Sequence, residues 1–183
     1  LEKANEPVYI AYANYEMARA LNALKRYSEC EPYFKKALPV FIATGDTQLI
    51  AETYVIMASL EVLKSNHKQA LELGKTGFDY AYDLNDMLLK TKAMMVIYAS
   101  SMMFAAQTGD KKFAVTKMIQ FEKELSLAQA YYDSCKCDPF ALMMIKSILS
   151  TIKQGIAQNT QNTQSAAAAL SKPLSDLEQL IKE

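Results

Sequence analysis

Apolar and polar residues alternate along the chain with the period of an α-helix, and the pattern breaks at short polar turns. Residues 11–46 predict two amphipathic helices joined by a tight turn. In the first helix, Ile10, Met17, Leu21 and Leu24 follow one another at spacings of seven, four and three. Because this spacing keeps them on one helical face, we expect them to form a single buried stripe.

The second helix of this hairpin has an apolar stripe of its own, at Cys30, Phe34, Ala37 and Phe41. Ser28 followed by Glu31 has the spacing of a capping box, which predicts the start of this helix. Gly45 predicts its end, and Asp46 the cap of the next helix. Pro39 lies inside the second helix and predicts a kink there, because it lacks a backbone donor.

The same pattern continues in two further predicted hairpins, over 47–86 and about 88–133, the latter turning at Gly109 and Asp110. Mid-helix glycines at Gly74 and Gly77 are unfavourable for a helix by about 1 kcal/mol each. We therefore interpret both glycines as points where two helices approach closely.

After the hairpins, Asp138 and Pro139 predict the start of one more helix. Its stripe is expected at Phe140, Met144, Ile148 and Ile152, and its end near Gly155. Residues 158–165 contain no apolar side chain and predict a linker. The tail, residues 166–183, predicts a short amphipathic helix anchored by Leu170, Leu174, Leu177 and Ile181.

Composition limits the class of protein. Apolar residues make up 51% of the 183 residues and charged residues 22%, which is typical of a globular chain. The formal net charge is +0, so nothing indicates direct binding of nucleic acid. The longest uncharged run, 93–109, predicts a buried helix and not a membrane span, because it contains several polar side chains.

Residues that could carry chemistry are few. The one histidine, His67, is expected in a polar turn as a surface or capping residue, so no catalytic residue is predicted. Cys135 and Cys137 could form half of a metal site, a labile disulfide or two separate thiols, and we favour separate thiols. Cys30 is expected to be a buried thiol. No metal or cofactor is predicted, and the odd cysteine count favours a cytoplasmic location.

Small residues at Ala18 and Cys30, twelve apart, are followed by Phe34 and Ala37. Ala58 and Ala70 repeat the twelve-residue spacing forty residues later. This pattern resembles the tetratricopeptide repeat family, although the tryptophan usual near the start of the repeat is absent. The resemblance implies an all-α, right-handed superhelix of about three elongated hairpins and a capping helix over residues 1–157.

In the family, the first helix of each hairpin lines a concave groove. The resemblance therefore implies a peptide-binding site whose residues are Tyr12, Tyr15, Arg19, Asn22, Glu52, Val55, Ser59 and Val62. A third set would follow at Val96, Ala99, Met103 and Ala106. Family members that clamp a terminal carboxylate have Lys and Asn where this chain has Tyr15 and Arg19, so we do not expect a carboxylate-tail ligand.

The leading hypothesis is a non-enzymatic module that binds a protein or peptide in this groove. The tail is expected either to occupy the groove of its own chain or to exchange with a second protomer and form a homodimer. The alternative is a sensor or regulatory segment of a larger bacterial signalling or transcription-regulatory protein. An enzyme on a helical scaffold and an all-α bundle without repeat ancestry remain the other two alternatives.

Overall fold

Left-handed residues end the helices of the N-terminal hairpins at intervals of twenty residues. Lys25, Gly45, Ser65 and Asn85 have φ values of 60°, 70°, 62° and 54°. The residue after each of them donates its backbone N–H to the carbonyl of the residue five positions before itself. The Asn66 nitrogen, for example, lies 2.9 Å from the Glu61 carbonyl oxygen. These bonds satisfy carbonyls that the helix end leaves without partners. The twenty-residue interval therefore fixes a forty-residue hairpin.

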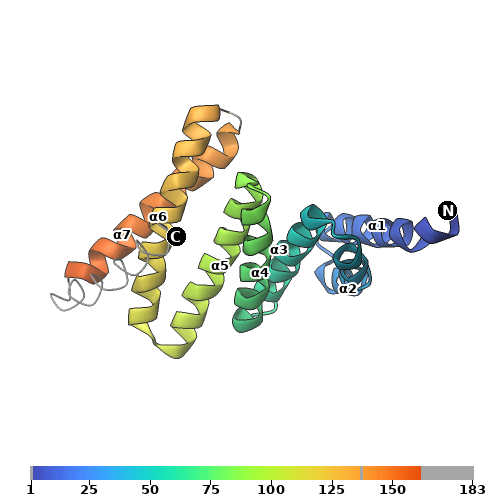
Figure 1. Cartoon of the computed structure of the whole chain (residues 1–183). Helices are drawn as coiled ribbons and strands as arrows, with labels where there is room; N and C mark the ends of the chain where they lie inside the picture. Colours follow the sequence, from blue (N-terminus) through green and yellow to red (C-terminus); the bar gives the residue numbers. More distant parts are fainter. Residues whose placement is uncertain (1, 137, 162–183) are drawn as a thin grey trace. The chain divides into compact units, whose positions relative to one another are not determined.

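The structure, a computed structural model, describes residues 2–136 and 138–161. Seven helices and no strand make up this part of the chain (Figure 1), which confirms the predicted all-α class. The helices are α1 (Glu2–Ala23), α2 (Tyr27–Thr44), α3 (Thr47–Leu63), α4 (His67–Asp83), α5 (Met87–Thr108), α6 (Lys111–Cys135) and α7 (Pro139–Gln161). The described residues form two compact units, which divide within α5 after Phe104.

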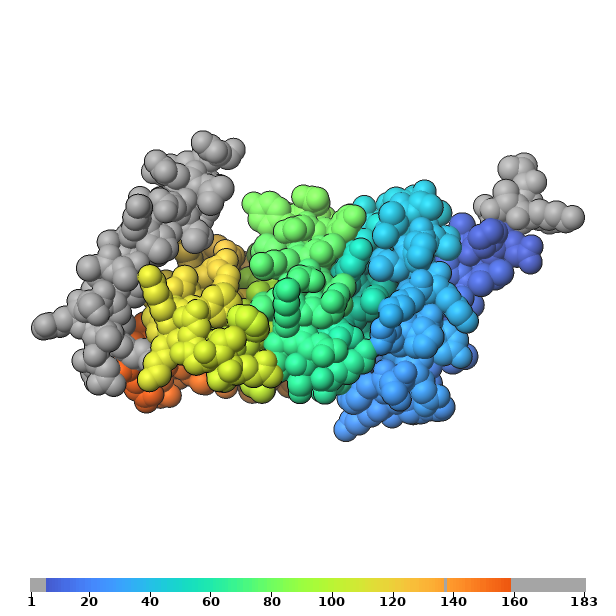
Figure 2. Space-filling view, turned by 90° about the horizontal axis from the view of Figure 1, so that it is seen from below, coloured from blue at the N-terminus to red at the C-terminus, as the bar shows by residue number. Residues whose placement is uncertain are grey.

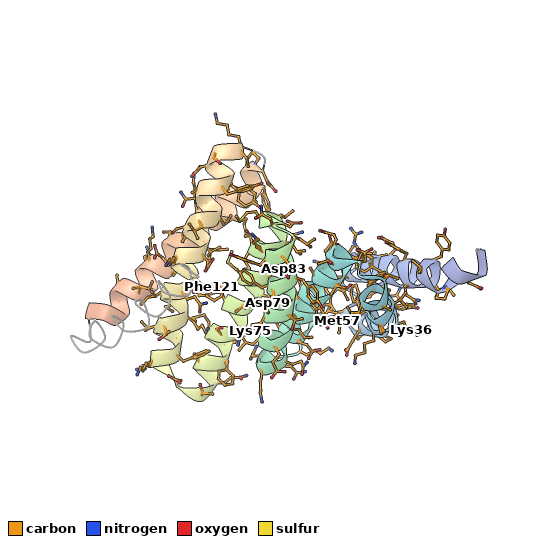
Figure 3. The ribbon with its side chains drawn as sticks, viewed as in Figure 1. Lys36, Met57, Lys75, Asp79, Asp83 and Phe121 are labelled. Atoms are coloured by element: carbon orange, nitrogen blue, oxygen red, sulfur yellow. The ribbon has the colours of Figure 1, made fainter. Side chains whose placement is uncertain are left out.

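The first unit contains the hairpins α1–α2 and α3–α4 and most of α5. Its largest core cluster combines the predicted stripe of α2, which is fully buried, with residues of α1 and α3. Tyr15 belongs to this cluster, and the centre of its ring lies 5.9 Å from the ring centre of Phe34 and 5.7 Å from that of Phe41. Met57 projects from α3 toward this cluster (Figure 3). Figure 2 shows α2 and α4 beside each other on the surface of the unit.

Both mid-helix glycines of α4 are close-approach points, as predicted. A Cβ on Gly77 would lie 2.8 Å from Cγ2 of Val55 and 3.1 Å from the Val55 backbone nitrogen. A Cβ on Gly74 would lie 3.0 Å from Cγ1 of Ile97. The absence of these side chains is what lets α4 pack against α3 on one side and α5 on the other.

The second unit is centred on α6 and α7, which pack as a hairpin. Its buried side chains are Phe121, Leu125, Ala128 and Tyr132 on α6 and Ile145, Leu149 and Ile152 on α7. Two ion pairs join the helices at their edges, Lys146 to Asp133 at 3.0 Å and Lys153 to Glu122 at 3.6 Å. Asp138 caps α7 by accepting from the Ala141 N–H, as predicted.

The stripe predicted for the first helix was wrong at three of its four residues, since only Leu21 is buried. In α1 the buried residues are Ala11, Tyr15, Ala18 and Leu21. Ile10, Met17 and Leu24 are exposed. Helix α1 has apolar residues on two faces, and the edge-to-face contacts of Tyr15 with Phe34 and Phe41 of α2 select the face that is buried.

Three smaller predictions also differ from the structure. The Ser28 side chain makes no cap, because the N-cap of α2 is Arg26, two residues earlier, and Arg26 pairs with Glu29 at 2.6 Å. The stripe of α7 is rotated, since Phe140 is exposed. Helix α7 also continues past Gly155 to Gln161, into the predicted linker. Residues 162–165 and the tail, 166–183, lie outside the described residues.

Within the described chain, the segment 139–158 of α7 is long and apolar enough to cross a membrane, with a mean hydropathy of 1.2 and 17% of it buried. This length and composition are weak support for a span, because core helices of soluble proteins share them. Here α7 packs Ile145, Leu149 and Ile152 against α6.

Candidate functional site

The residues predicted to line a groove come from equivalent positions of α1 and α3, and the structure gives them different environments. Tyr12 and Arg19 are exposed. Four others are half-buried, namely Asn22, Glu52, Ser59 and Val62. Tyr15 and Val55 are buried, with exposed fractions of 1% and 5%, so their side chains are not open to a ligand.

Tyr15 is buried, and its hydroxyl reaches a carboxylate at the edge of the core. The hydroxyl donates a hydrogen bond to Oε2 of Glu52, on the equivalent helix of the next hairpin. Burial, and then the hydrogen bond to Glu52, raise the pKa of Tyr15 well above its usual range. Tyr15 therefore joins α1 to α3 and fixes the Glu52 carboxylate at the edge of the core.

Arg19 lies beside this bond. Its guanidinium carbon is 5.6 Å from the centre of the Tyr15 ring, and Nη1 donates to Oε1 of Glu16 at 2.9 Å. The hydrogen bond to Glu16, followed by the nearby Tyr15, raises the pKa of Arg19. The side chain is exposed, so Arg19 is a cation that a ligand can reach.

A second tyrosine makes a parallel connection. The Tyr12 hydroxyl donates to Oδ2 of Asp46 at 2.7 Å, and this bond raises the pKa of Tyr12. Asp46 is also the N-cap of α3, where Oδ1 accepts from the Leu49 N–H at 3.2 Å. One carboxylate thus caps α3 and holds Tyr12.

The polar contacts extend to α5 through Gln48. Its amide donates to Glu52 at 2.8 Å and, more distantly, to Asp86 at 3.4 Å. Asp86 caps α5 as Asp46 caps α3, accepting from the Leu89 N–H at 2.9 Å. We call these connected side chains the tyrosine–carboxylate row: Tyr12, Tyr15, Arg19, Asp46, Gln48, Glu52 and Asp86.

Sequence reasoning missed three members of this row, Asp46, Gln48 and Asp86, as surface residues of the site. A signal for two of them was present, because Asp46 and Asp86 are forty residues apart and each follows a helix end. Each of these two carboxylates accepts one hydrogen bond from the backbone of the helix that it caps and another from a side chain, Tyr12 for Asp46 and Gln48 for Asp86. A capping pattern in the sequence does not predict the second bond.

The expected aliphatic end of the groove is largely interior. Val55 packs against Gly77, and the Ser59 hydroxyl donates to the Val55 carbonyl at 3.0 Å. In α5, Val96 and Ala99 are half-buried. Met103 is exposed, and Ala106, also exposed, belongs to the second unit. The tail residues Leu170, Leu174, Leu177 and Ile181 lie outside the described residues, so their anchoring role stays a prediction.

The outer face of the second helix of a hairpin has a different character. Lys75, Asp79 and Asp83 follow one another along α4 at intervals of four residues, and all three are exposed (Figure 3). Charges at this spacing mark a solvated helix face. These residues are therefore suitable control positions for substitutions of charged residues in the candidate site.

His67 was wrongly predicted to be a surface residue. It is 3% exposed at the start of α4, and neither ring nitrogen has a hydrogen-bond partner. It occupies the position of Tyr27 forty residues earlier, which packs against the core of the first hairpin. Its ring therefore serves as a packing element.

The cysteines have separate environments. Cys30 is a buried free thiol that donates to the Arg26 carbonyl at 3.3 Å, and burial raises its pKa. Cys135 is disulfide-bonded, which corrects the expectation of two separate thiols, and Cys137 lies outside the described residues. Among the residues that the structure describes, no group of three or more His, Cys, Asp or Glu could hold a metal ion.

Comparison with known proteins identifies one part of the chain. Residues 9–81, which contain α2, α3 and most of α1 and α4, match the family described as tetratricopeptide repeat. No curated protein and no solved structure matches the chain significantly.

Proposed function

Because residues 9–81 belong to the tetratricopeptide repeat family, we propose that the chain is a scaffold that binds a peptide segment of a protein partner along the tyrosine–carboxylate row. Repeats of this family generally mediate protein–protein interaction and are typically non-enzymatic. The observation that supports a site at this row is the alignment of exposed polar groups on the first helices of successive hairpins, α1, α3 and the start of α5.

The chemistry of the row favours a ligand that donates hydrogen bonds. Three carboxylates, those of Asp46, Glu52 and Asp86, follow one another along it, and Arg19 is its one cation. Carboxylates bind backbone N–H groups and Lys or Arg side chains more strongly than neutral acceptors do. We therefore expect an extended or helical peptide with basic side chains, in agreement with the absence of a carboxylate clamp.

The experiment is a peptide array of basic, neutral and acidic sequences probed with the labelled chain, followed by fluorescence anisotropy on the best binders. Glu52→Gln should weaken binding of basic peptides by about tenfold, because it removes a charge-assisted hydrogen bond. The matched control is Asp79→Asn on the outer face of α4, which should leave binding unchanged. Equal losses in both variants, or a preference for acidic peptides, would contradict the proposal.

The same assay addresses the tail. A synthetic peptide of residues 166–183 contains Lys172 and Lys182 beside its apolar residues, and also Asp176, Glu178 and Glu183. We expect it to compete with basic peptides if the tail is a ligand of the row, either in its own chain or in a second protomer. A failure to compete at any concentration would remove the tail from the proposal and leave an external partner. A sensor or regulatory segment of a larger signalling protein could use the same row.

A further inference from the structure

The exposed stripe of α1 has the pattern of a helix-packing surface. Large and small residues alternate along it at heptad spacing, namely Ile10, Ala13, Met17, Ala20 and Leu24. All five are exposed, with Ile10 at 54%, Met17 at 48% and Leu24 at 67%. Contiguous apolar residues on one exposed helix face mark an interaction surface. We call these five residues the α1 stripe.

The equivalent residues of the next hairpin show what such a stripe does. Forty residues further on, Ile50 is 3% exposed and Leu60 2%, and both belong to the core cluster that α3 shares with α1 and α2. Thr53 is fully buried, and Met57 packs against the same cluster. The fifth position is Lys64, which binds Glu31 of α2. In α3 this face is therefore the contact with the preceding hairpin.

Within the first unit, α1 (Figure 1) packs on α2 through the face of Ala11, Tyr15 and Ala18, and no helix of this unit covers the stripe. We propose that the α1 stripe binds the α1 stripe of a second copy of this chain, in an antiparallel pair related by a two-fold axis. This contact is independent of the tyrosine–carboxylate row and of the tail.

The alternation of large and small residues makes the α1 stripe complementary to a second copy of itself. In an antiparallel pair centred between Met17 and Ala20, the Met17 of each copy lies opposite Ala20 of the other. Leu24 then lies opposite Ala13, so a large side chain meets a small one at each of these layers. A surface that matches itself in this way is what a two-fold symmetric dimer requires.

Charges around the stripe favour the same orientation. Glu6 precedes the stripe and Glu16, which pairs with Arg19, lies at its middle, whereas Lys25 follows its C-terminal end. An antiparallel pair brings the acidic half of one helix toward the basic end of the other, and a parallel pair would bring like charges together. One helix face buries less than the roughly 1,600 Å² of a standard interface, so the dimer should be weak and concentration-dependent.

The test uses the full chain in sedimentation equilibrium over a concentration series. The unaltered chain should dimerise, and Met17→Asp should weaken the dimer by about tenfold or more, because it places a carboxylate in an apolar contact. Met143→Asp is the matched control, since Met143, on α7, is at least as accessible as Met17, with 58% of it exposed against 48%. It should leave the dimer unchanged, and circular dichroism verifies that both variants fold.

A mixing experiment identifies the partner. The chain with Met17→Asp and the chain with Ala20→Lys should each be monomeric, and an equimolar mixture should recover the dimer, because position 17 of one copy lies opposite position 20 of the other. A chain that stays monomeric at every concentration would overturn the proposal. A dimer that survives Met17→Asp would also overturn it, because the chains would then associate through another surface. Two variants that stay monomeric after mixing would overturn it as well, because another surface or the tail would then cover the stripe.

Discussion

At the scale of single residues, Gly77 is the position where packing leaves least room. Any side chain there meets Val55 at 2.8 Å and the backbone of α3 at 3.1 Å and 3.3 Å. Backbone atoms cannot rotate away as the end of a side chain can, so α3 and α4 would have to separate. The helix tolerates this glycine because the close approach of the two helices offsets its low propensity.

We expect Gly77→Ala to destabilise the first unit by about 1–3 kcal/mol, the usual cost of overpacking. Gly155→Ala is the control, because its Cβ would meet only the flexible Met118 side chain, at 3.3 Å from Sδ. It should be neutral or slightly stabilising. Urea unfolding followed by circular dichroism measures both, and an unchanged midpoint for Gly77→Ala would contradict the packing argument.

Tyr15→Phe isolates the hydroxyl that joins the two hairpins. The ring keeps its contacts with Phe34 and Phe41, so the loss should be that of one hydrogen bond to a carboxylate, about 1–2 kcal/mol at neutral pH. Tyr12→Phe is the comparison, since its exposed hydroxyl should contribute less.

The pH dependence of this variant has a definite sign. The pKa of Tyr15 is raised in the folded chain, so its contribution is fully present below about pH 10, where an unfolded tyrosine begins to ionise. Above that pH the unfolded state loses the proton first, and stability falls. The difference in unfolding free energy between the natural chain and Tyr15→Phe should therefore shrink between about pH 10 and 11. A difference that stays constant would show that the hydroxyl is not buried.

At the scale of elements, the helix ends determine where each hairpin turns. Lys25 and Ser65 adopt the left-handed region, which a residue with a Cβ reaches at a cost of about 1 kcal/mol. Gly45 occupies the same region without that cost. Lys25 and Ser65 therefore retain backbone strain that glycine would remove, and Asn85, the third non-glycine link, retains less because asparagine tolerates this conformation better.

We expect Lys25→Gly to stabilise the first unit by about 0.5–1 kcal/mol, because glycine suits the left-handed conformation. The matched control is Lys36→Gly in the middle of α2 (Figure 3), which should destabilise by about 1 kcal/mol, since it weakens a regular helix. Thermal unfolding at low protein concentration measures both. Two destabilised variants would mean that the Lys25 turn does not set the helix end.

The helices themselves were predictable from the sequence because their period, glycine stops and aspartate caps agree. Their rotation was not always predictable. Helix α2 has a single apolar face at Cys30, Phe34, Ala37 and Phe41, and this face was correctly predicted. Helix α1 has two such faces, so periodicity could not decide between the stripe at Met17 and the one around Tyr15. The choice depends on the tertiary contact of Tyr15 with α2, which no local pattern contains.

The candidate site was predictable only in part for the same reason. Among the residues that the resemblance implies, Tyr12, Arg19 and Glu52 lie on exposed or half-buried surface. It could not show that Val55 is closed off by Gly77, because that contact joins residues of two helices. The buried state of His67 likewise follows from the repeat equivalence with Tyr27 and not from its polar neighbours in sequence.

At the scale of the whole molecule, the division within α5 has a consequence for cooperativity. In repeat proteins each element is stabilised mainly by its nearest neighbours, so a local perturbation spreads only as far as coupling between neighbours allows. The unit formed by residues 1–104 and the unit that begins at Ala105 each have a core of their own. We therefore expect them to open as separate cooperative units.

Hydrogen exchange with mass spectrometry tests this expectation with one variant for each unit. Gly77→Ala should reduce protection in α1–α4 while α6 and α7 keep the protection of the natural chain. Ile152→Ala removes a buried side chain of α7, at a cost of about 2–5 kcal/mol, and should do the reverse. A loss of protection that spreads evenly over all seven helices in either variant would show that α5 couples the units into one. The chain would then transmit a change at the tyrosine–carboxylate row along its whole length.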